Sequence, residues 1–245
     1  DIEYHFLTSD EDKLKALEFV RSFVDSCAQS LRPLTMLVTD YMIVDAGSEG
    51  PTRTTELHNF RAMAWGDVID LTEEERAELI ESTCKDLVGE KIQNFTDVVY
   101  QFQLVSDDYY SNNWPQALPE ISACILEEVN EDDPYADLSS WFGDNYATYV
   151  LDLGYTHEQA IEALNERRDA YCAICGAWGF VYGYGRMASY TAPTADDDLD
   201  CYLERILSDG GAAWFERYYS SYPLVMKKYE LLRDAIVNEM GVKLN

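Results

Sequence analysis

The chain lacks basic residues over a long stretch. The 75 residues from Ile92 to Glu166 contain no Lys or Arg, while they hold fifteen Asp and Glu. A folded segment of this kind projects a negative electrostatic field, and such a field indicates which partners the protein attracts but not which fold it adopts. This absence argues against direct binding of nucleic acid, whose phosphates are recognised by Lys and Arg. It also argues against docking onto anionic lipid.

Long apolar runs are missing as well, because no stretch approaches the roughly 18 apolar residues needed to span a bilayer. We therefore expect no membrane association. Cys27, Cys84, Cys124 and Cys201 fall within apolar periodic segments, which is the usual place for buried free thiols. A reducing, cytoplasmic location follows as an expectation.

The usual catalytic and metal motifs are absent. There is no Walker A, HExxH or GxSxG sequence. Neither the acidic run 127–133 nor the run 196–200 has the glycine and terminal glutamate of an EF-hand loop. Gly183-Tyr184-Gly185-Arg186-Met187-Ala188 has the outline of a dinucleotide fingerprint, but no strand–helix–strand alternation surrounds it. We expect no cofactor, no metal and no catalytic residue, although an enzyme with an unrecognised site near 178–190 is one alternative.

Cys172 and Cys175 have the CxxC spacing of zinc and redox sites. A zinc site would need further Cys or His ligands, and the chain has only three His. The pair lies deep within a predicted helix instead of opening one, so two core-facing thiols are the better interpretation.

What the chain does have is a large apolar fraction together with an excess of acid. Apolar residues make up 47%, and 18 Tyr are present, so the chain can bury a core. The net charge is −28, yet residues 181–245 are nearly balanced, with ten acids and seven bases. A salt-rich environment, simple solubility or ordinary acidity without a special partner would each explain part of this pattern.

The periodicity predicts an α+β, predominantly helical fold: a small α+β part over 1–113 and a helical part over 114–245, or one continuous domain. A capping box of Thr8 and Glu11 predicts a helix to about Ser30, with a core stripe that includes Leu14 and Leu17. A strand is expected over Leu34–Asp45, a helix after Thr72, and either a strand or a helix over Phe95–Val105. Further helices are expected over 119–130, 137–153, 156 to about 176, 198–208, and 212–240 with a break at Pro223.

One predicted helix carries a row of carboxylates. Glu158, Glu162 and Glu166 recur at i, i+4 and i+8, which places successive levels about 6 Å apart along one face. One strand of duplex DNA carries a charge about every 3.4 Å. The row is therefore within a factor of two of a phosphate backbone in charge density. Asp137, Asp144 and Asp152 share a face of the preceding helix more sparsely.

These observations predict an inhibitor that imitates nucleic acid and blocks the basic channel of a nucleic-acid-binding protein or nuclease. In charge and length the chain resembles phage-encoded DNA mimics that disarm restriction or CRISPR nucleases. Rims formed by Tyr109, Tyr110, Trp114 and Trp141 would add apolar anchors. The expected partner-binding residues are Asp107, Asp108, Glu127, Glu128, Glu131, Asp132, Asp133, Asp137, Asp144, Asp152, Glu158, Glu162 and Glu166.

Two further alternatives remain open at this point. An immunity protein that neutralises one basic nuclease toxin would use the same physics on a narrower target. The aromatic C-terminal residues Trp214, Phe215, Tyr218, Tyr219 and Tyr222 form either core or the self-association face of a homodimer.

Overall fold

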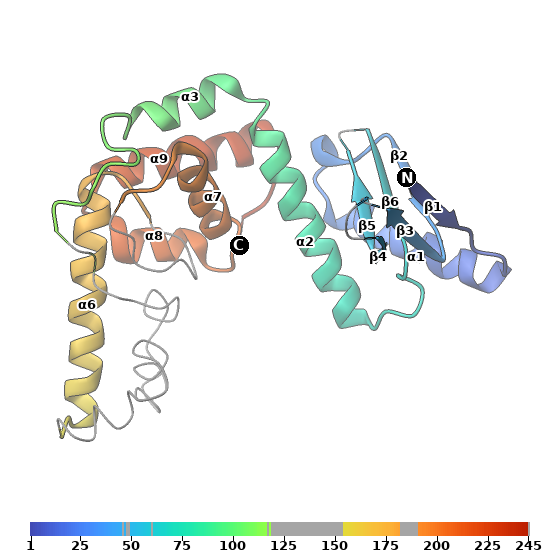
Figure 1. The fold of residues 1–245 in the computed structure, drawn as a ribbon, viewed down its shortest axis with the longest axis horizontal. Helices are drawn as coiled ribbons and strands as arrows, with labels where there is room; N and C mark the ends of the chain where they lie inside the picture. Colours follow the sequence, from blue (N-terminus) through green and yellow to red (C-terminus); the bar gives the residue numbers. More distant parts are fainter. Residues whose placement is uncertain are drawn as a thin grey trace. The chain divides into compact units, whose positions relative to one another are not determined.

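The computed structural model describes residues 1–45, 47, 50–59, 61–116, 118, 154–181 and 191–244. These residues form seven α-helices and two three-stranded sheets, so the fold is α+β and predominantly helical (Figure 1). The chain divides into two compact units. Unit 1 comprises Asp1–Asn94 with Ile236–Lys243, and unit 2 comprises Phe95–Ala235 with Leu244–Asn245. The segment 95–113 thus belongs to unit 2, whereas the division predicted from the sequence falls after it.

Unit 1 contains two small sheets. The first is antiparallel, in the order β1 (Ile2–His5), β3 (Tyr41–Asp45) and β4 (Pro51–Thr54). In the second, β6 (Ala62–Trp65) is central and pairs in parallel with β2 (Thr35–Val38) and antiparallel with β5 (Glu56–His58).

The single strand predicted over Leu34–Asp45 is therefore wrong, because β2 and β3 belong to different sheets. Thr39, which is fully buried, lies between them, and its Oγ1 donates to the carbonyl of Trp65 at 3.1 Å. Gly66 allows the backbone at Tyr41, the first residue of β3, to lie close to it, since a Cβ at Gly66 would lie 3.0 Å from the Cα of Tyr41.

Helix α1 (Asp10–Ser26) begins one residue later than the sequence suggests. Ser9 is its N-cap and accepts from the backbone N–H of Asp12 at 3.0 Å, so the capping box predicted for Thr8 and Glu11 is wrong. The helix buries Ala16, Phe19 and Phe23, while Leu14 and Leu17 of the predicted stripe are 63% and 65% exposed. The apolar positions of α1 permit two stripes, and the aromatic one contacts the core. A short 3-10 turn, η1 (Gln29–Leu31), follows.

Helix α2 (Glu73–Ile92) has the predicted start. Thr72 and Glu75 form a reciprocal capping box, in which the hydroxyl of Thr72 accepts from the N–H of Glu75 at 3.2 Å. Helical spacing predicts a buried stripe of Ala77, Ile80, Cys84, Leu87 and Val88. Of these, Ile80, Leu87 and Val88 are buried and Cys84 is half-buried, but Ala77 is exposed. The predicted water-facing residues, Glu74, Glu78 and Glu81, are exposed.

The core of unit 1 centres on Trp65, which is fully buried. Phe19 and Phe23 of α1 meet its ring edge-on, with centroids 5.2 and 4.9 Å away. Burying rings of this size dominates the energetics of a small core, and edge-to-face contacts add to it.

Unit 2 is helical throughout its described elements. These are α3 (Thr96–Leu104), α6 (His157–Ala177), α7 (Ala195–Ile206), α8 (Gly211–Tyr219) and α9 (Pro223–Asp234). A π-helical turn, η3 (Ala235–Glu239), follows α9, and from Ile236 onward it belongs to unit 1. Of the two alternatives for 95–105, helix is the one observed, and its Phe102 is fully buried edge-on to Tyr202 at 5.1 Å. Thr194 caps α7, which begins at Ala195, three residues before the predicted start at Asp198.

The C-terminal aromatics form much of the core of unit 2. Phe215 and Tyr219 are fully buried and Trp214 is 9% exposed. Phe215 stacks on Tyr229 of α9 with centroids 4.4 Å apart. The helix breaks at Pro223 as predicted, because proline fits the first turn of α9 and lacks the N–H that an interior position donates. Of the two roles expected for these residues, core packing is observed, and the homodimer stays a prediction.

Candidate functional site

Helix α6 carries the predicted row of carboxylates, and its start is defined by a local signal. Gln159 N–H donates to the hydroxyl of Thr156 at 3.3 Å, and Thr156 N–H donates to the side chain of Gln159 at 2.9 Å. Gly154 precedes this capping box with φ +67°, the left-handed conformation that glycine adopts without strain. The helix therefore starts at the predicted residue and ends at Ala177, one residue beyond the predicted limit near Gly176.

Glu158, Glu162 and Glu166 are all exposed on α6. Asp169 follows Glu166 by three residues, which returns it to the same face, and its side chain is 70% exposed. We call these four residues the acidic column. It spans about 16 Å, at about 1.5 Å per residue. Sequence reasoning missed Asp169, although the i+3 spacing after Glu166 is a signal that would have found it.

The other side of α6 anchors the helix. Tyr171, Cys172 and Cys175 are buried, and α6 packs against α8 and α9 (Figure 1). At Gly176 a Cβ would lie 2.7 Å from the ring of Tyr222, so only glycine permits this approach. The C-terminal half of α6 is thus fixed in the core of unit 2, and Figure 1 shows its N-terminal half extending beyond α8 and α9.

The first bases after the base-free segment, Arg167 and Arg168, lie near the C-terminal end of the column. Arg167 lies nine positions after Glu158, which places it about half a turn round the helix from that residue. Arg168 is 12% exposed, donates to Asn165 at 2.8 Å, and lies with its guanidinium carbon 4.8 Å from the ring centroid of Tyr218. It also pairs with Asp169 at 3.0 Å, so the C-terminal level of the column is partly neutralised.

Asp107 and Asp108 are exposed in the turn that follows α3, as a binding role requires. The amide of Asn112 donates to the carbonyl of Asp108 at 2.6 Å and holds this turn. The remaining predicted carboxylates lie outside the described residues: Glu127, Glu128, Glu131, Asp132, Asp133, Asp137, Asp144 and Asp152.

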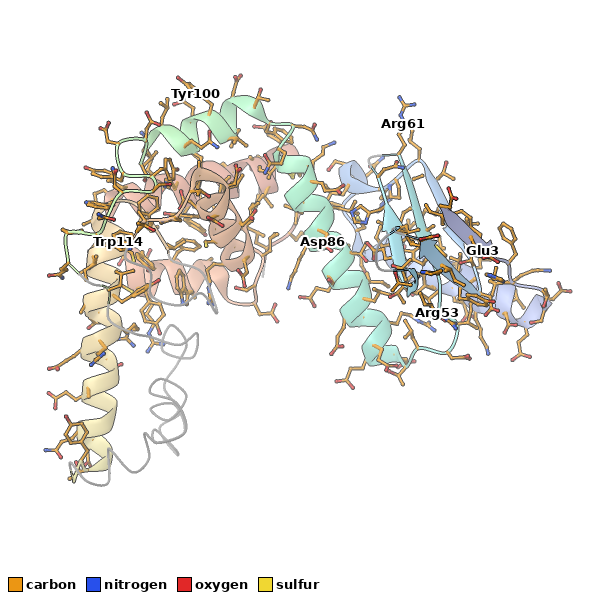
Figure 2. All side chains as sticks on the ribbon, viewed as in Figure 1. Glu3, Arg53, Arg61, Asp86, Tyr100 and Trp114 are labelled. Carbon is orange, nitrogen blue, oxygen red and sulfur yellow. The ribbon has the colours of Figure 1, made fainter. Side chains whose placement is uncertain are left out.

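The predicted aromatic rim is wrong at Trp114. This residue, labelled in Figure 2, is 7% exposed. Its ring stacks on Trp178 with centroids 5.1 Å apart, and Tyr109 stacks on Trp178 at 4.9 Å. Trp141 lies outside the described residues. Aromatic rings close to an acidic turn can serve as anchors or as core. Here the packing around Trp178 removes Trp114 from the surface.

A buried ion pair lies inside unit 2, and sequence reasoning did not find it. Asp198 of α7 and Lys228 of α9 are both fully buried, with Lys228 Nζ 2.6 Å from Asp198 Oδ2. The hydroxyl of Tyr110 donates to the same carboxylate oxygen at 2.9 Å. Among the described acidic residues, Asp198 is the one in the core.

Aromatic rings surround the ammonium group of Lys228. Its Nζ lies 4.7 Å from the ring centroid of Phe180, 4.8 Å from that of Phe102, 5.3 Å from that of Tyr110 and 5.6 Å from that of Tyr202. Burial lowers the pKa of Lys228, although Asp198 opposes this effect. The cluster joins α3, α7, α9 and the turn at Tyr110, and it contributes to the rigidity of the unit that carries the acidic column.

The titration of Asp198 gives a testable pH dependence. Burial raises its pKa to about 6, against the partial opposing effects of Lys228 and Tyr110. Because the folded pKa exceeds the ordinary value of 3.8, this group stabilises the fold at low pH, and the contribution is lost as the pH rises through about 6.

Relative to the double variant Asp198→Asn/Lys228→Met, the wild type should gain about 2–3 kcal/mol in free energy of unfolding between pH 7 and pH 4. Urea unfolding at a series of pH values measures this difference. Stability curves that run parallel over that range would contradict the assignment.

A second polar cluster lies in unit 1. His58 of β5 has Nδ1 2.9 Å from Glu56 and Nε2 3.0 Å from Glu90 of α2. The buried Thr83 donates its hydroxyl to Glu56. Both ring nitrogens of His58 are thus engaged by carboxylates, and the arrangement serves to attach β5 to α2.

The CxxC pair lies on the core side of α6. Both thiols, Cys172 and Cys175, are buried, as predicted. No group of three or more His, Cys, Asp and Glu side chains is placed to hold a metal ion within the described ranges. In that same part of the chain, no helix has the length and apolarity needed to cross a membrane.

Comparison with known proteins gives no identification. No protein-family model matches the chain, and no curated protein and no solved structure is significantly similar to it. The functional argument therefore depends on the geometry and charge of this molecule alone.

Proposed function

We propose that this protein is an acidic inhibitor that presents the carboxylates of α6 to the basic nucleic-acid channel of a target protein. The observation that carries the proposal is the acidic column, four exposed carboxylates on one face of a helix anchored in a packed core. Channel Arg and Lys that pair with phosphates would pair with these carboxylates instead. Fast association and a steep loss of affinity with salt follow from such a surface.

Two features support a rigid presentation of charge. The capping box at Thr156 fixes where α6 begins, and the contact of Gly176 with Tyr222 fixes its C-terminal end. Preorganised carboxylates lose little conformational entropy on binding, so more of their interaction energy appears as affinity. An immunity protein against a single basic nuclease toxin would use the same surface, and only the breadth of targets distinguishes the two.

The proposal predicts that nucleic acid competes with this protein for the proteins that it captures. The immobilised protein, incubated with a cell lysate at low salt, should retain basic proteins that soluble duplex DNA then releases. Failure of DNA to release them would separate capture from nucleic-acid mimicry and contradict the proposal.

The variant Glu158→Lys/Glu162→Lys/Glu166→Lys should fold normally and lose roughly 100-fold in affinity for a captured target, because three attractive contacts become repulsive. Affinity is measured by surface plasmon resonance at two salt concentrations, and folding by circular dichroism.

A matched control is available on α2. Glu74→Lys/Glu78→Lys/Glu81→Lys makes the same change in net charge on another exposed helix face, where Lys85 already pairs with Glu81 at 2.6 Å. This control should retain affinity to within about threefold, since it alters only long-range attraction. Equal losses in the two triple variants would mean that net charge, and not the acidic column, determines binding.

A further inference from the structure

Strand β1 forms an edge of the first sheet, because among the described strands it pairs with β3 alone. The N–H of Asp45 donates to the carbonyl of Asp1 at 2.9 Å, so residue 1 belongs to a hydrogen-bonded pair of the two strands. Hydrogen-bonded and non-hydrogen-bonded pairs alternate along an antiparallel ladder. The backbone N–H and C=O groups of Ile2, Tyr4 and Phe6 therefore point away from β3, toward the open edge.

This edge is apolar on one face of the sheet. The side chains of Ile2, Tyr4 and Phe6 alternate onto the same face, and all three are exposed. The rings of Tyr4 and Phe6 stack with centroids 6.5 Å apart. Proteins usually protect an open edge with lysine or proline, and the stretch 2–7 contains neither. An apolar edge without these residues indicates that another strand pairs with it.

The other face of the same edge carries an acid and a histidine. Glu3, labelled in Figure 2, is exposed, and its Oε1 lies 2.8 Å from Nε2 of His5. The ring of His5 stacks on that of Tyr41 in β3 with centroids 3.9 Å apart, so its position is fixed. The two polar side chains of β1 are thus suited to pair with each other.

The order of the residues in this stretch is self-complementary. When two copies of β1 lie antiparallel with Tyr4 opposite Tyr4, Ile2 of each copy lies opposite Phe6 of the other copy. On the other face Glu3 then lies opposite His5. This register joins outward-pointing backbone groups of both copies, as an antiparallel ladder requires. A shift by two residues would place Glu3 opposite Glu3 or His5 opposite His5, so cross-strand pairing favours the register centred on Tyr4.

We propose that this protein forms a symmetric homodimer in which β1 pairs antiparallel with β1 of a second copy, in the register centred on Tyr4. The twofold axis passes between the two Tyr4 residues, and the two sheets become one continuous sheet. This interface is not the aromatic C-terminal region, where Phe215 and Tyr219 are buried in the core. Because β1 belongs to unit 1 and the acidic column to unit 2, the dimer does not depend on the proposed function.

Interface size and net charge determine the conditions in which the dimer forms. A strand pair of this length buries little surface, and small interfaces give weak, transient complexes. Each copy has a net charge of −28, so two copies repel each other at low salt. Salt screens this repulsion, with a Debye length of about 8 Å at physiological ionic strength. The dimer should therefore strengthen as the salt concentration rises, whereas the proposed target capture weakens.

Sedimentation velocity of the full chain over roughly 1–500 µM, at low and at high salt, measures the association. We expect a monomer that converts to a dimer as the concentration rises, at lower concentrations in high salt. Phe6→Lys should weaken the dimer roughly tenfold or more, because it removes two symmetry-related apolar pairs. The matched control is Tyr100→Lys on α3, which makes the same charge change at a similarly exposed ring (58% against 64% for Phe6) and should leave the dimer unchanged.

Two charge variants test the register. Glu3→Lys places a lysine opposite His5, and His5→Glu places two acids opposite each other, so each variant alone should dimerise roughly tenfold more weakly than the wild type. In a mixture, the new lysine of one copy lies opposite the new glutamate of the other, and Glu3 still lies opposite His5 at the second position. We expect the mixture to form a heterodimer about as tight as the wild-type dimer. Native mass spectrometry detects it when one variant carries nitrogen-15.

Three results would overturn the proposal. One is a wild type that stays monomeric over the whole concentration range, which would leave this edge to a strand of another protein. Another is a dimer that Phe6→Lys does not weaken. The third is a mixture of the two charge variants that associates no better than either alone. Circular dichroism checks that each variant folds, and the mixture still decides the question if Phe6→Lys does not.

Discussion

Replacing Lys228 by methionine should lower the free energy of unfolding by about 3–5 kcal/mol at pH 7. The change leaves Asp198 fully buried without its counter-charge, and Asp198 Oδ1 already has no hydrogen-bond partner among the residues that the structure describes. Without Lys228 the pKa of Asp198 rises further, since the ammonium group is the main influence that lowers it. Urea unfolding followed by circular dichroism measures the loss.

Two controls separate this effect from the loss of a lysine as such. Lys227→Met removes the exposed neighbour and should change stability by no more than about 0.5 kcal/mol. The double variant Asp198→Asn/Lys228→Met should recover most of the loss, because no buried charge then lacks a partner. A Lys228→Met protein as stable as the wild type would mean that the ion pair does not form.

Replacing Trp65 by alanine should cost unit 1 about 3–5 kcal/mol. The ring is fully buried and meets Phe19 and Phe23 edge-on, so its removal leaves a cavity that the two helical phenylalanines cannot fill. Trp65→Phe should cost less than half as much, because it keeps an aromatic ring and removes an indole N–H for which the described part of the chain provides no hydrogen-bond partner.

The matched control for Trp65 is Leu14→Ala on α1. Leu14 is 63% exposed, so its truncation should change the urea midpoint very little. If Leu14→Ala destabilised unit 1 as much as Trp65→Ala, the exposed side of α1 would be packed against something, and the assignment of the core face would be wrong.

The sequence located those features whose signals lie within one or two turns of chain. The capping boxes at Thr72 and Thr156 fixed the starts of α2 and α6, since each needs only two side chains three residues apart. The exposure of Glu158, Glu162 and Glu166 followed from helical spacing alone. Helical position also predicted Cys172 and Cys175 as core thiols, and their burial confirms this.

Errors arose where one local pattern allowed two solutions. The apolar positions of α1 offer a leucine stripe and a phenylalanine stripe, and only the packing on Trp65 selects the second. The continuous β-rich run 34–45 gives no sign of the sheet change at Thr39, because that change depends on the carbonyl of Trp65. The sequence predicted Trp114 as a surface anchor, whereas in the structure its ring stacks on that of Trp178.

By itself, the sequence determined the α+β class, the starts of α2 and α6, and the one-signed charge that the proposed function uses. Only the tertiary structure decided that Asp198 meets Lys228 and that Trp114 stacks on Trp178. Composition and periodicity report the faces of single elements. Pairs from different elements are brought together by packing, which depends on the shapes of all the side chains between them.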